Sequence, residues 1–549
     1  MPPNTDDTTK DVEYSTSVPR ADQYAHSLTF SAKQLILPKS TSITREQLKR
    51  IEDAVLHYHP ALSENISKYG DTSFYEYSKN FVRTNPNPAI TPRVEAFSAV
   101  FKKEVERLFG PEAAESAVRQ LTLNHSVSTS QHFVPLSPNA FNPTLQYALP
   151  AFDNPTPATE NVIVLACAGI SFANFWLPRG HFFHAFTENR LIENQITFFG
   201  RSTDSFSLLY YPGYDMEAVQ LVKKRLITLV NERLMGKKEG NMLQKFIDEV
   251  CANPSILNTS TYVDQLTITT ARLWEDIFAT QPNHPRLLFV AQELVVLELL
   301  KEHHLYRDTP IHKLLFNSQW HTLLLKHFNG IQGAFVTERN YGTFLFWGIS
   351  KKDGYRVRLW KKDNFLVADN ETLKIELTPE GIAEAMRKQE IIPSLLVTFV
   401  TLGFYYGLII GGGLAQTIYL TNMKDAYIKM LEELGETEER DLIRDTPTMD
   451  FSIPRPTVAY LDTESGDRVS ASAMDFFLYR DTNKWHAIVE ATKNVTLQEV
   501  CQRLLPELYK RFVPSDQQEE DLLKITEYDV EKLNGLDKKI PAWTTLSDT

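Results

Sequence analysis

Two kinds of apolar spacing divide the chain, and the commoner one predicts helices. Apolar residues recur every three or four positions at 44–60, 91–110 and 215–236, and each segment begins at a capping residue and ends at Pro or Gly. The same spacing continues through 241–326, where we expect further helices, one of them over the apolar stretch 286–304. Helices are therefore expected to dominate this part of the chain.

The other spacing predicts strands. Val162 to Ala168 is a continuous apolar run with the length and composition of a strand buried on both faces. Asp353 and Gly354 separate two alternating segments and predict a hairpin, and we also expect short strands at 196–201 and 206–214 and a hairpin at 473–489. Strand and helix do not alternate regularly. The pattern predicts a large, helix-rich α+β fold, with several short strands or hairpins in a mixed or antiparallel sheet and two lobes.

Changes in composition suggest where the domains begin and end. Residues 1–20 are polar and are predicted to be a disordered tail. We expect a helix-rich N-terminal lobe over 21–335, a C-terminal lobe with a hairpin and buried helices over 336–513, and an acidic extension over 514–549.

The segment from Ile391 to Met423 carries no charged residue and is long enough to form a transmembrane helix. Pro393 and the glycines at 403, 407 and 411–413 interrupt it, and polar side chains are scattered through it. Basic flanks and aromatic belts are missing. We therefore predict two buried helices that meet at a glycine turn, and no membrane partner.

Overall composition narrows the class of protein. The chain has 549 residues, of which 42% are hydrophobic, and this is enough to build a sizeable core. A formal net charge of -12 argues against sequence-independent binding to nucleic acid, which requires Lys and Arg to neutralise phosphates. The three cysteines, Cys167, Cys251 and Cys501, lack CxxC spacing, and the acidic, polar N-terminus does not resemble a secretory signal. We expect a soluble protein in the cytoplasm.

Familiar catalytic motifs are absent from the sequence. It contains no GxxxxGK[ST] phosphate loop, no GxSxG and no HExxH, and the residues after Gly411 to Gly413 do not continue a dinucleotide fingerprint. The sequence therefore gives no support to the common hydrolase, kinase or zinc-protease mechanisms.

The densest cluster of candidate chemistry follows the apolar run at 162–168. If a helix begins after Gly180, His181, His184 and Glu188 share one face of it, and such a group binds a divalent transition metal such as Zn, Fe or Mn. Without a metal, the histidines would act as acid and base. The structural alternative is a pair of ordinary buried histidines among aromatic residues.

An uncharged polar loop at 121–147 is the expected partner of this cluster. The predicted catalytic residues from both segments are His125, His132, His181 and His184. Arg179 would hold a carboxylate or phosphate, or would instead form an internal ion pair. The predicted substrate-binding residues are Arg179, Ser128, Ser171 and Asn174.

Two other segments offer different chemistry. His303 to Asp308, HHLYRD, resembles the HHxxxD motif of CoA-dependent acyltransferases and peptide condensation domains, and the resemblance implies His304 as base and Asp308 in a structural role. Those families place a glycine next, where this chain has Thr309. In the segment from Gly411 to Tyr419, amides at the start of a helix would receive an anion, or the glycines would simply connect two helices.

These observations support three hypotheses. In the first, the protein is an enzyme that acts on a small polar metabolite, anionic ones included, through histidine acid/base or metal chemistry. The second is a CoA-dependent acyltransferase-like enzyme that uses His304. The third is a non-catalytic binding or scaffold protein in which every histidine is structural.

Overall fold

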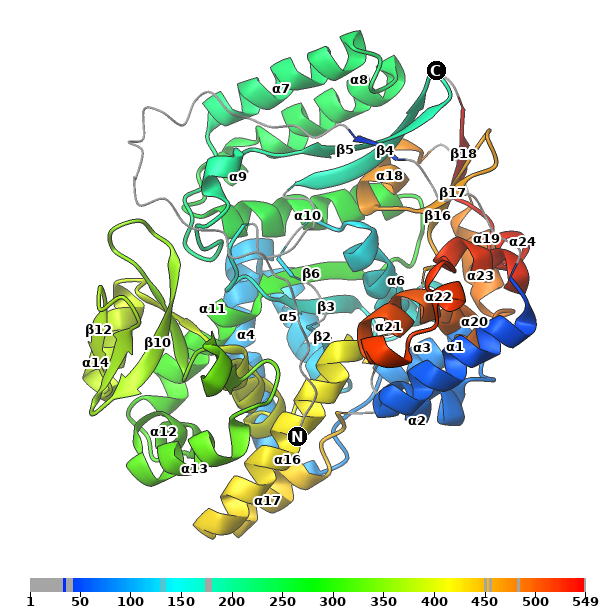
Figure 1. The fold of residues 1–549 in the computed structure, drawn as a ribbon. Coiled ribbons are helices and arrows are strands. Elements are labelled where there is room, and N and C mark those ends of the chain that lie inside the picture. The colour runs from blue at the N-terminus through cyan, green and yellow to red at the C-terminus, as the bar shows by residue number, and fades with distance from the viewer. Residues whose placement is uncertain are drawn as a thin grey trace.

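We describe a computed structural model of the chain that covers residues 33–35, 43–129, 132–133, 135–172, 180–448, 452–453, 457–480 and 484–547. The α+β class is confirmed, with five sheets in the residues that the structure describes. Helices pack around the central sheet, while β10 and β12 lie at one edge of the view and β17 and β18 at the opposite edge (Figure 1). The expected tail at 1–20 and the candidates Asn174 and Arg179 lie outside the described residues.

The central sheet is parallel throughout and has the strand order β15-β14-β2-β3-β6. Its bounds are β2 (Ser126–Ser128), β3 (Asn161–Ala166), β6 (Arg286–Ala291), β14 (Ile409–Gly413) and β15 (Ser452–Ile453). The strand β3 confirms the prediction from the apolar run, and all six of its residues are buried. Side chains of a strand alternate between its faces, so β3 contributes Val162 and Val164 to one core and Ile163 and Leu165 to another.

Helices cover both faces of this sheet, as a parallel sheet requires. One face is covered by α6 (Pro138–Asp153) and α10 (Tyr262–Phe278). The other is covered by α4 (Thr91–Phe109), α5 (Pro111–Leu121), α11 (Gln292–Leu299), the π-helical turn η6 (Leu300–His304) and α16 (Leu414–Leu434). Figure 1 shows β3 and β6 at the centre of the molecule, between α10 and α4.

Two antiparallel sheets lie outside the central layers. One has the order β1-β5-β4, with β1 (Lys33–Gln34), β4 (His181–Thr187) and β5 (Arg190–Ile196). It is accompanied by α7 (Met216–Asn231), α8 (Lys237–Phe246), the π-helical turn η5 (Ile247–Cys251), α9 (Pro254–Leu257), α18 (Ala473–Leu478) and α19 (Trp485–Thr492). A hairpin was expected at 473–489, but α18 and α19 stand there, and α18 begins at a capping box formed by Ser472 and Asp475.

The second antiparallel sheet has the order β12-β11-β10-β9-β13. Its strands are β9 (Phe346–Ile349), β10 (Arg356–Lys362), β11 (Phe365–Ala368), β12 (Lys374–Glu376) and β13 (Ile391–Pro393). The hairpin predicted at Asp353 and Gly354 joins β9 to β10, and Gly354 has the positive φ of +71° that such turns favour. Nearby elements are α12 (Pro310–Phe316), α13 (Ser318–Phe328), β7 (Phe335–Val336), β8 (Tyr341–Gly342) and α14 (Pro379–Arg387).

The C-terminal part of the chain combines a small sheet with a group of helices. Strands β16 (Tyr460–Thr463), β17 (Arg468–Ser470) and β18 (Thr544–Leu546) form the sheet. The helices are α20 (Leu497–Gln502), α21 (Leu505–Phe512), α22 (Glu520–Leu523), α23 (Glu527–Asn534) and α24 (Leu536–Lys539), next to α1 (Arg45–Tyr58), α2 (Pro60–Tyr69) and α3 (Phe74–Ser78). A small separate core joins α1, α2, α21, α22 and α23.

Two helical segments occur in 391–423 as predicted, but they do not meet at a glycine turn, because Gly411 to Gly413 belong to strand β14. The segment contains β13, α15 (Leu395–Phe399), the π-helical turn η8 (Val400–Tyr405), β14 and the start of α16, which continues toward α17 (Thr437–Arg444). Its charge-free character reflects burial of β14 inside the central sheet. In the described residues, no helix has the length and apolarity needed to cross a membrane.

Candidate functional site

The central sheet changes the direction of its connections between β2 and β14. After β2 the chain continues into α6 on one face of the sheet, whereas after β14 it enters α16 on the other face. Because the two connections diverge, they leave a crevice at the carboxyl ends of these neighbouring strands, where open parallel sheets commonly bind ligands. This edge of the sheet is the place to look for a site.

A cavity of about 220 Å³ opens at this crevice. Its walls come from the residues that follow four parallel strands: Thr129 after β2, Cys167 after β3, Gln292 after β6 and Gly413 in β14. Further lining residues are His132, Gln332, Leu395, Phe399, Ala415, Gln416, Tyr419, Leu504, Glu507, Leu508, Arg511 and Phe512. The last five belong to α21 and the residue before it, and they form one wall of the cavity. Figure 1 shows α21 beside the amino end of α16.

The glycines of β14 shape the polar wall. The Gln416 amide donates to Thr129 Oγ1 at 2.5 Å, and Thr129 N–H donates to Gly411 O at 3.0 Å. A Cβ on Gly412 would lie 2.3 Å from Gln416 Cδ, so only glycine lets Gln416 fold back to Thr129. A Cβ on Gly413 would meet no atom within 4 Å, so the backbone at the cavity wall is open to close approach.

Several groups in the cavity wall are suited to bind a polar ligand. The helix α16 has 21 residues and no side-chain cap at its amino end, so its first amides and partial positive charge face the crevice. Gln292 is 1% exposed, and its Oε1 has no hydrogen-bond partner. Arg511 is exposed on α21 and pairs with no carboxylate in the described part of the chain. The arrangement suits a ligand with one anionic group and one N–H or O–H donor.

The turn after β3 is fixed from two sides. Glu293, buried at the start of α11, accepts from Ala168 N–H at 2.9 Å and from the Cys167 thiol at 3.3 Å. A Cβ on Gly169 would lie 2.8 Å from Glu293 Oε1, which explains the glycine. From outside, Arg356 donates to Gly169 O at 2.6 Å while its guanidinium lies over the Trp347 ring.

Burial controls the protonation of this turn. Burial raises the pKa of the Glu293 carboxyl, although backbone N–H groups oppose the shift. Burial, and then the nearby Glu293, raises the pKa of the Cys167 thiol well above its ordinary value. Cys167 therefore stays a neutral thiol at physiological pH and is a poor nucleophile.

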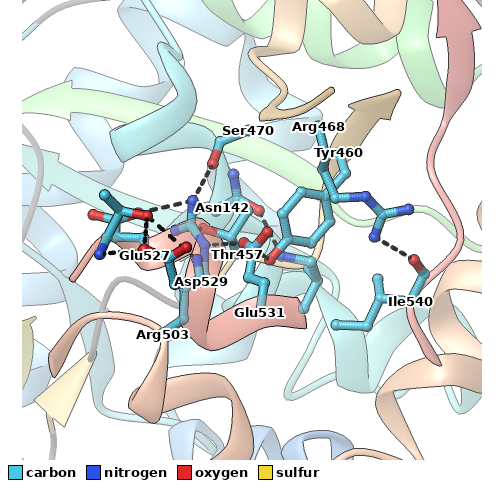
Figure 2. Close-up of polar contacts among 12 residues, drawn as sticks. Asn142, Thr457, Tyr460, Arg468, Ser470, Arg503, Glu527, Asp529, Glu531 and Ile540 are labelled. Atoms are coloured by element: carbon cyan, nitrogen blue, oxygen red, sulfur yellow. Dashed lines mark hydrogen bonds and ion pairs between the residues drawn. The ribbon is translucent and has the colours of Figure 1, made fainter. Parts of the chain in front are cut away.

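The covering helix α21 is positioned by Arg503, whose side chain is 13% exposed. Its guanidinium forms an ion pair with Glu531 and another with Glu527 at 2.9 Å, both on α23. It also donates to Thr457 Oγ1 at 2.9 Å and to Ser470 Oγ at 3.2 Å, beside the small C-terminal sheet (Figure 2). Arg503 thus ties the beginning of α21 to two other parts of the fold.

Of the predicted catalytic histidines, His132 lines the cavity. His125 lies at the other end of β2, where its Nδ1 accepts from Asn85 N–H at 2.9 Å and burial lowers its pKa. Of the predicted substrate-binding residues that the structure describes, neither Ser128 nor Ser171 lines the cavity. Ser128 is the last residue of β2 and fully buried, while Ser171 pairs with Ser207 away from the cavity lining.

The helix expected after Gly180 is the strand β4, so the shared face predicted for His181, His184 and Glu188 does not exist. Residues three apart on a strand point to opposite faces. His184 Nδ1 lies 2.9 Å from Asp475 Oδ2, His181 is buried beside Phe246, and Glu188 lies in the turn after β4. No cluster of three or more His, Cys, Asp or Glu side chains able to hold a metal ion occurs among the described residues.

His304 has a position unlike that of the base in the motif it resembles. It is 1% exposed, its Nδ1 lies 2.9 Å from Thr309 Oγ1, and its Nε2 lies 3.0 Å from the Tyr406 hydroxyl. Burial lowers its pKa to about 3, and Asp308 is exposed. Both ring nitrogens are held within the fold, which leaves neither for a substrate.

Comparison with known proteins adds no assignment. No protein-family model and no curated protein matches this chain. The site must therefore be judged on its own geometry.

Sequence reasoning missed Gln292, Glu293 and Arg511. The first two lie just after β6, inside the stretch 286–304 that was expected to be one helix. The end of the uninterrupted apolar run Leu287 to Ala291 at Gln292 and Glu293 was the available signal. Nothing in the sequence connects α21 with the central sheet, because that contact depends on tertiary packing alone.

Proposed function

We propose that the protein is an enzyme that binds a small anionic metabolite at the carboxyl edge of the central sheet. One observation carries the proposal: a cavity lies at the crevice between β2 and β14, with the uncapped amino end of α16 and the unpartnered Gln292 Oε1 in its wall. The anionic group binds the α16 amides, Arg511 approaches it from α21, and a hydroxyl or amine of the ligand donates to Gln292.

His132 is the proposed acid or base. Among the described residues, it is the histidine that lines this cavity. Cys167 is excluded as a thiolate nucleophile by its raised pKa. All three cysteines are free thiols, which agrees with the proposed location in the cytoplasm.

Binding is tested by calorimetric titration of the full chain with orthophosphate, ribose 5-phosphate, citrate and malate, and with ribose and glycerol as uncharged probes. We expect at least one of the anions to bind and the uncharged probes not to bind. Gly413 has φ -65°, which any residue adopts, so Gly413→Leu fills the cavity without backbone strain and abolishes binding. Gly413→Ala is the matched control with a smaller effect. Anion binding that survives Gly413→Leu would place the site elsewhere.

Catalysis is tested with whichever probe binds, by following its conversion over time by proton and phosphorus NMR. His132→Gln lowers the rate of conversion about 100-fold or more and leaves the dissociation constant within about threefold. If the wild-type protein binds a probe but converts none, the catalytic half of the proposal fails and a binding protein remains.

A further inference from the structure

A second cavity lies next to the cavity at the sheet edge, along α16. This second cavity, of about 480 Å³, shares the lining residues Gln332 and Tyr419 with the first. Ala415, Gln416 and Tyr419 line the first cavity, while Tyr419, Asn422 and Lys429 line the second. These positions lie on one side of the helix, so the two cavities are neighbours along about 20 Å of α16.

The walls of the second cavity differ from those of the first. Ile331, Ile418 and the Tyr419 ring supply partly buried apolar surface. The amides of Gln332 and Asn422 are exposed at its edge, and neither forms a hydrogen bond with the described residues. Lys326, His327, Asp425 and Lys429 also line this cavity. Apolar surface bordered by amides and charged side chains suits a planar heterocycle, which packs on the apolar part and pairs its polar edge with these groups.

The spacing of the two cavities also suits such a ligand. Seven residues separate Ala415, at the amino end of α16, from Asn422, which corresponds to about 10 Å along the helix. A nucleoside monophosphate covers this span, with its phosphate at the first amides of α16 and its base beside Tyr419 and Asn422. A sugar phosphate or a small carboxylate would fill the first cavity only.

We infer that the metabolite bound at the sheet edge is a nucleoside phosphate, with its base in the second cavity between Tyr419, Ile331 and Asn422. The inference rests on the proposed function for the position of the phosphate. It adds a second subsite, in which apolar surface, amides and the charged side chains of Lys326, Asp425 and Lys429 are available to the base.

Calorimetric titration of the full chain compares AMP, GMP, CMP and UMP with ribose 5-phosphate, which lacks the base, and with adenosine and guanosine, which lack the phosphate. We expect at least one nucleotide to bind about tenfold or more tightly than ribose 5-phosphate, because stacking of a base adds affinity. The matching nucleoside binds more weakly than its nucleotide.

Asn422→Trp separates the two subsites. Asn422 is exposed, so Trp at this position fills the second cavity without disturbing the core. It should remove the advantage of the nucleotide while leaving binding of ribose 5-phosphate unchanged. Glu432→Trp, at an exposed α16 position outside both linings, is the matched control and should change neither. Melting temperatures of both variants verify that they are folded.

The possible failures are distinguishable. Equal affinity for the nucleotides and ribose 5-phosphate, or a nucleotide advantage that persists in Asn422→Trp, overturns the second subsite and leaves the proposed function intact. Binding of citrate or malate without binding of any phosphate-bearing probe has the same consequence. If no anion of either panel binds, both the inference and the proposed function are wrong.

Discussion

The buried pair of His184 and Asp475 provides a quantitative test of the fold. Asp475 is 0% exposed and accepts four hydrogen bonds: from His184 N–H at 2.6 Å, His184 Nδ1 at 2.9 Å, Ser472 N–H at 2.8 Å and Ser472 Oγ at 2.9 Å. Asp475→Ala leaves two backbone N–H groups and one imidazole without an acceptor inside the protein. Each buried donor left unpaired costs about 1–3 kcal/mol, so the free energy of unfolding should fall by about 3–5 kcal/mol.

Urea denaturation followed by tryptophan fluorescence measures this loss, and hydrogen exchange should locate the weakened region at β4 and α18. Asp475→Asn keeps one acceptor oxygen and should lose about half as much stability. Asp516→Ala, at an exposed aspartate in the same C-terminal part of the chain, is the control and should be neutral within about 0.5 kcal/mol. A loss below about 1 kcal/mol for Asp475→Ala would refute the view that this aspartate holds β4 to α18.

Three further predictions concern buried ionisable groups. Burial lowers the pKa of His181 to about 4 from 6.5. The stability that neutral His181 contributes is therefore complete above pH 6.5, and up to about 3 kcal/mol of it is lost as the pH falls toward 4. The drop in melting temperature on acidification should be smaller in His181→Phe. Glu293→Ala removes a negative charge beside Cys167, so iodoacetamide should alkylate this thiol several-fold faster at pH 7.5, as measured by intact mass. Arg503→Met leaves Glu531 buried without its cation and should lower the free energy of unfolding by about 3–5 kcal/mol in urea denaturation.

Local signals in the sequence predicted elements whose ends carry chemical markers. The helices predicted from residues 44 and 215 begin at their capping residues, Thr44, which forms a capping box with Gln47, and Asp215. These predictions succeed because a cap satisfies backbone N–H groups within its own first turn and needs no distant partner. The prediction of a strand from the run at 162–168 also succeeds, since a short apolar run between polar residues is typical of a strand buried on both faces.

Where two buried elements follow one another, the same reasoning fails. Apolar residues predominate in both β6 and α11, so the hydrophobic period does not separate the two elements. In β4, aromatic residues occupy both faces, and His181 and His184 were therefore placed on a helix. The glycines at 411–413 suggested a turn, although in β14 they allow the close approach of Gln416.

The candidate site was predictable only in part. Its position after the strand at 162–168 and the involvement of His132 and of the helix after Gly413 were within reach of sequence reasoning. The other walls of the cavity could not be predicted. Strand order brings Gln292 to the cavity and helix packing brings α21 there, and local sequence patterns encode neither.

The strand order of the central sheet has a consequence for synthesis of the chain. β2 pairs with β3 on one side and with β14 on the other, yet β14 follows β2 by roughly 280 residues. At about 5–20 residues per second, the ribosome needs about 15–55 seconds to deliver that partner. During this interval the second edge of β2 is unpaired, and unpaired edges invite pairing with other chains. The nascent protein should therefore depend on chaperones until residue 413 has emerged, and premature termination before β14 should yield aggregates.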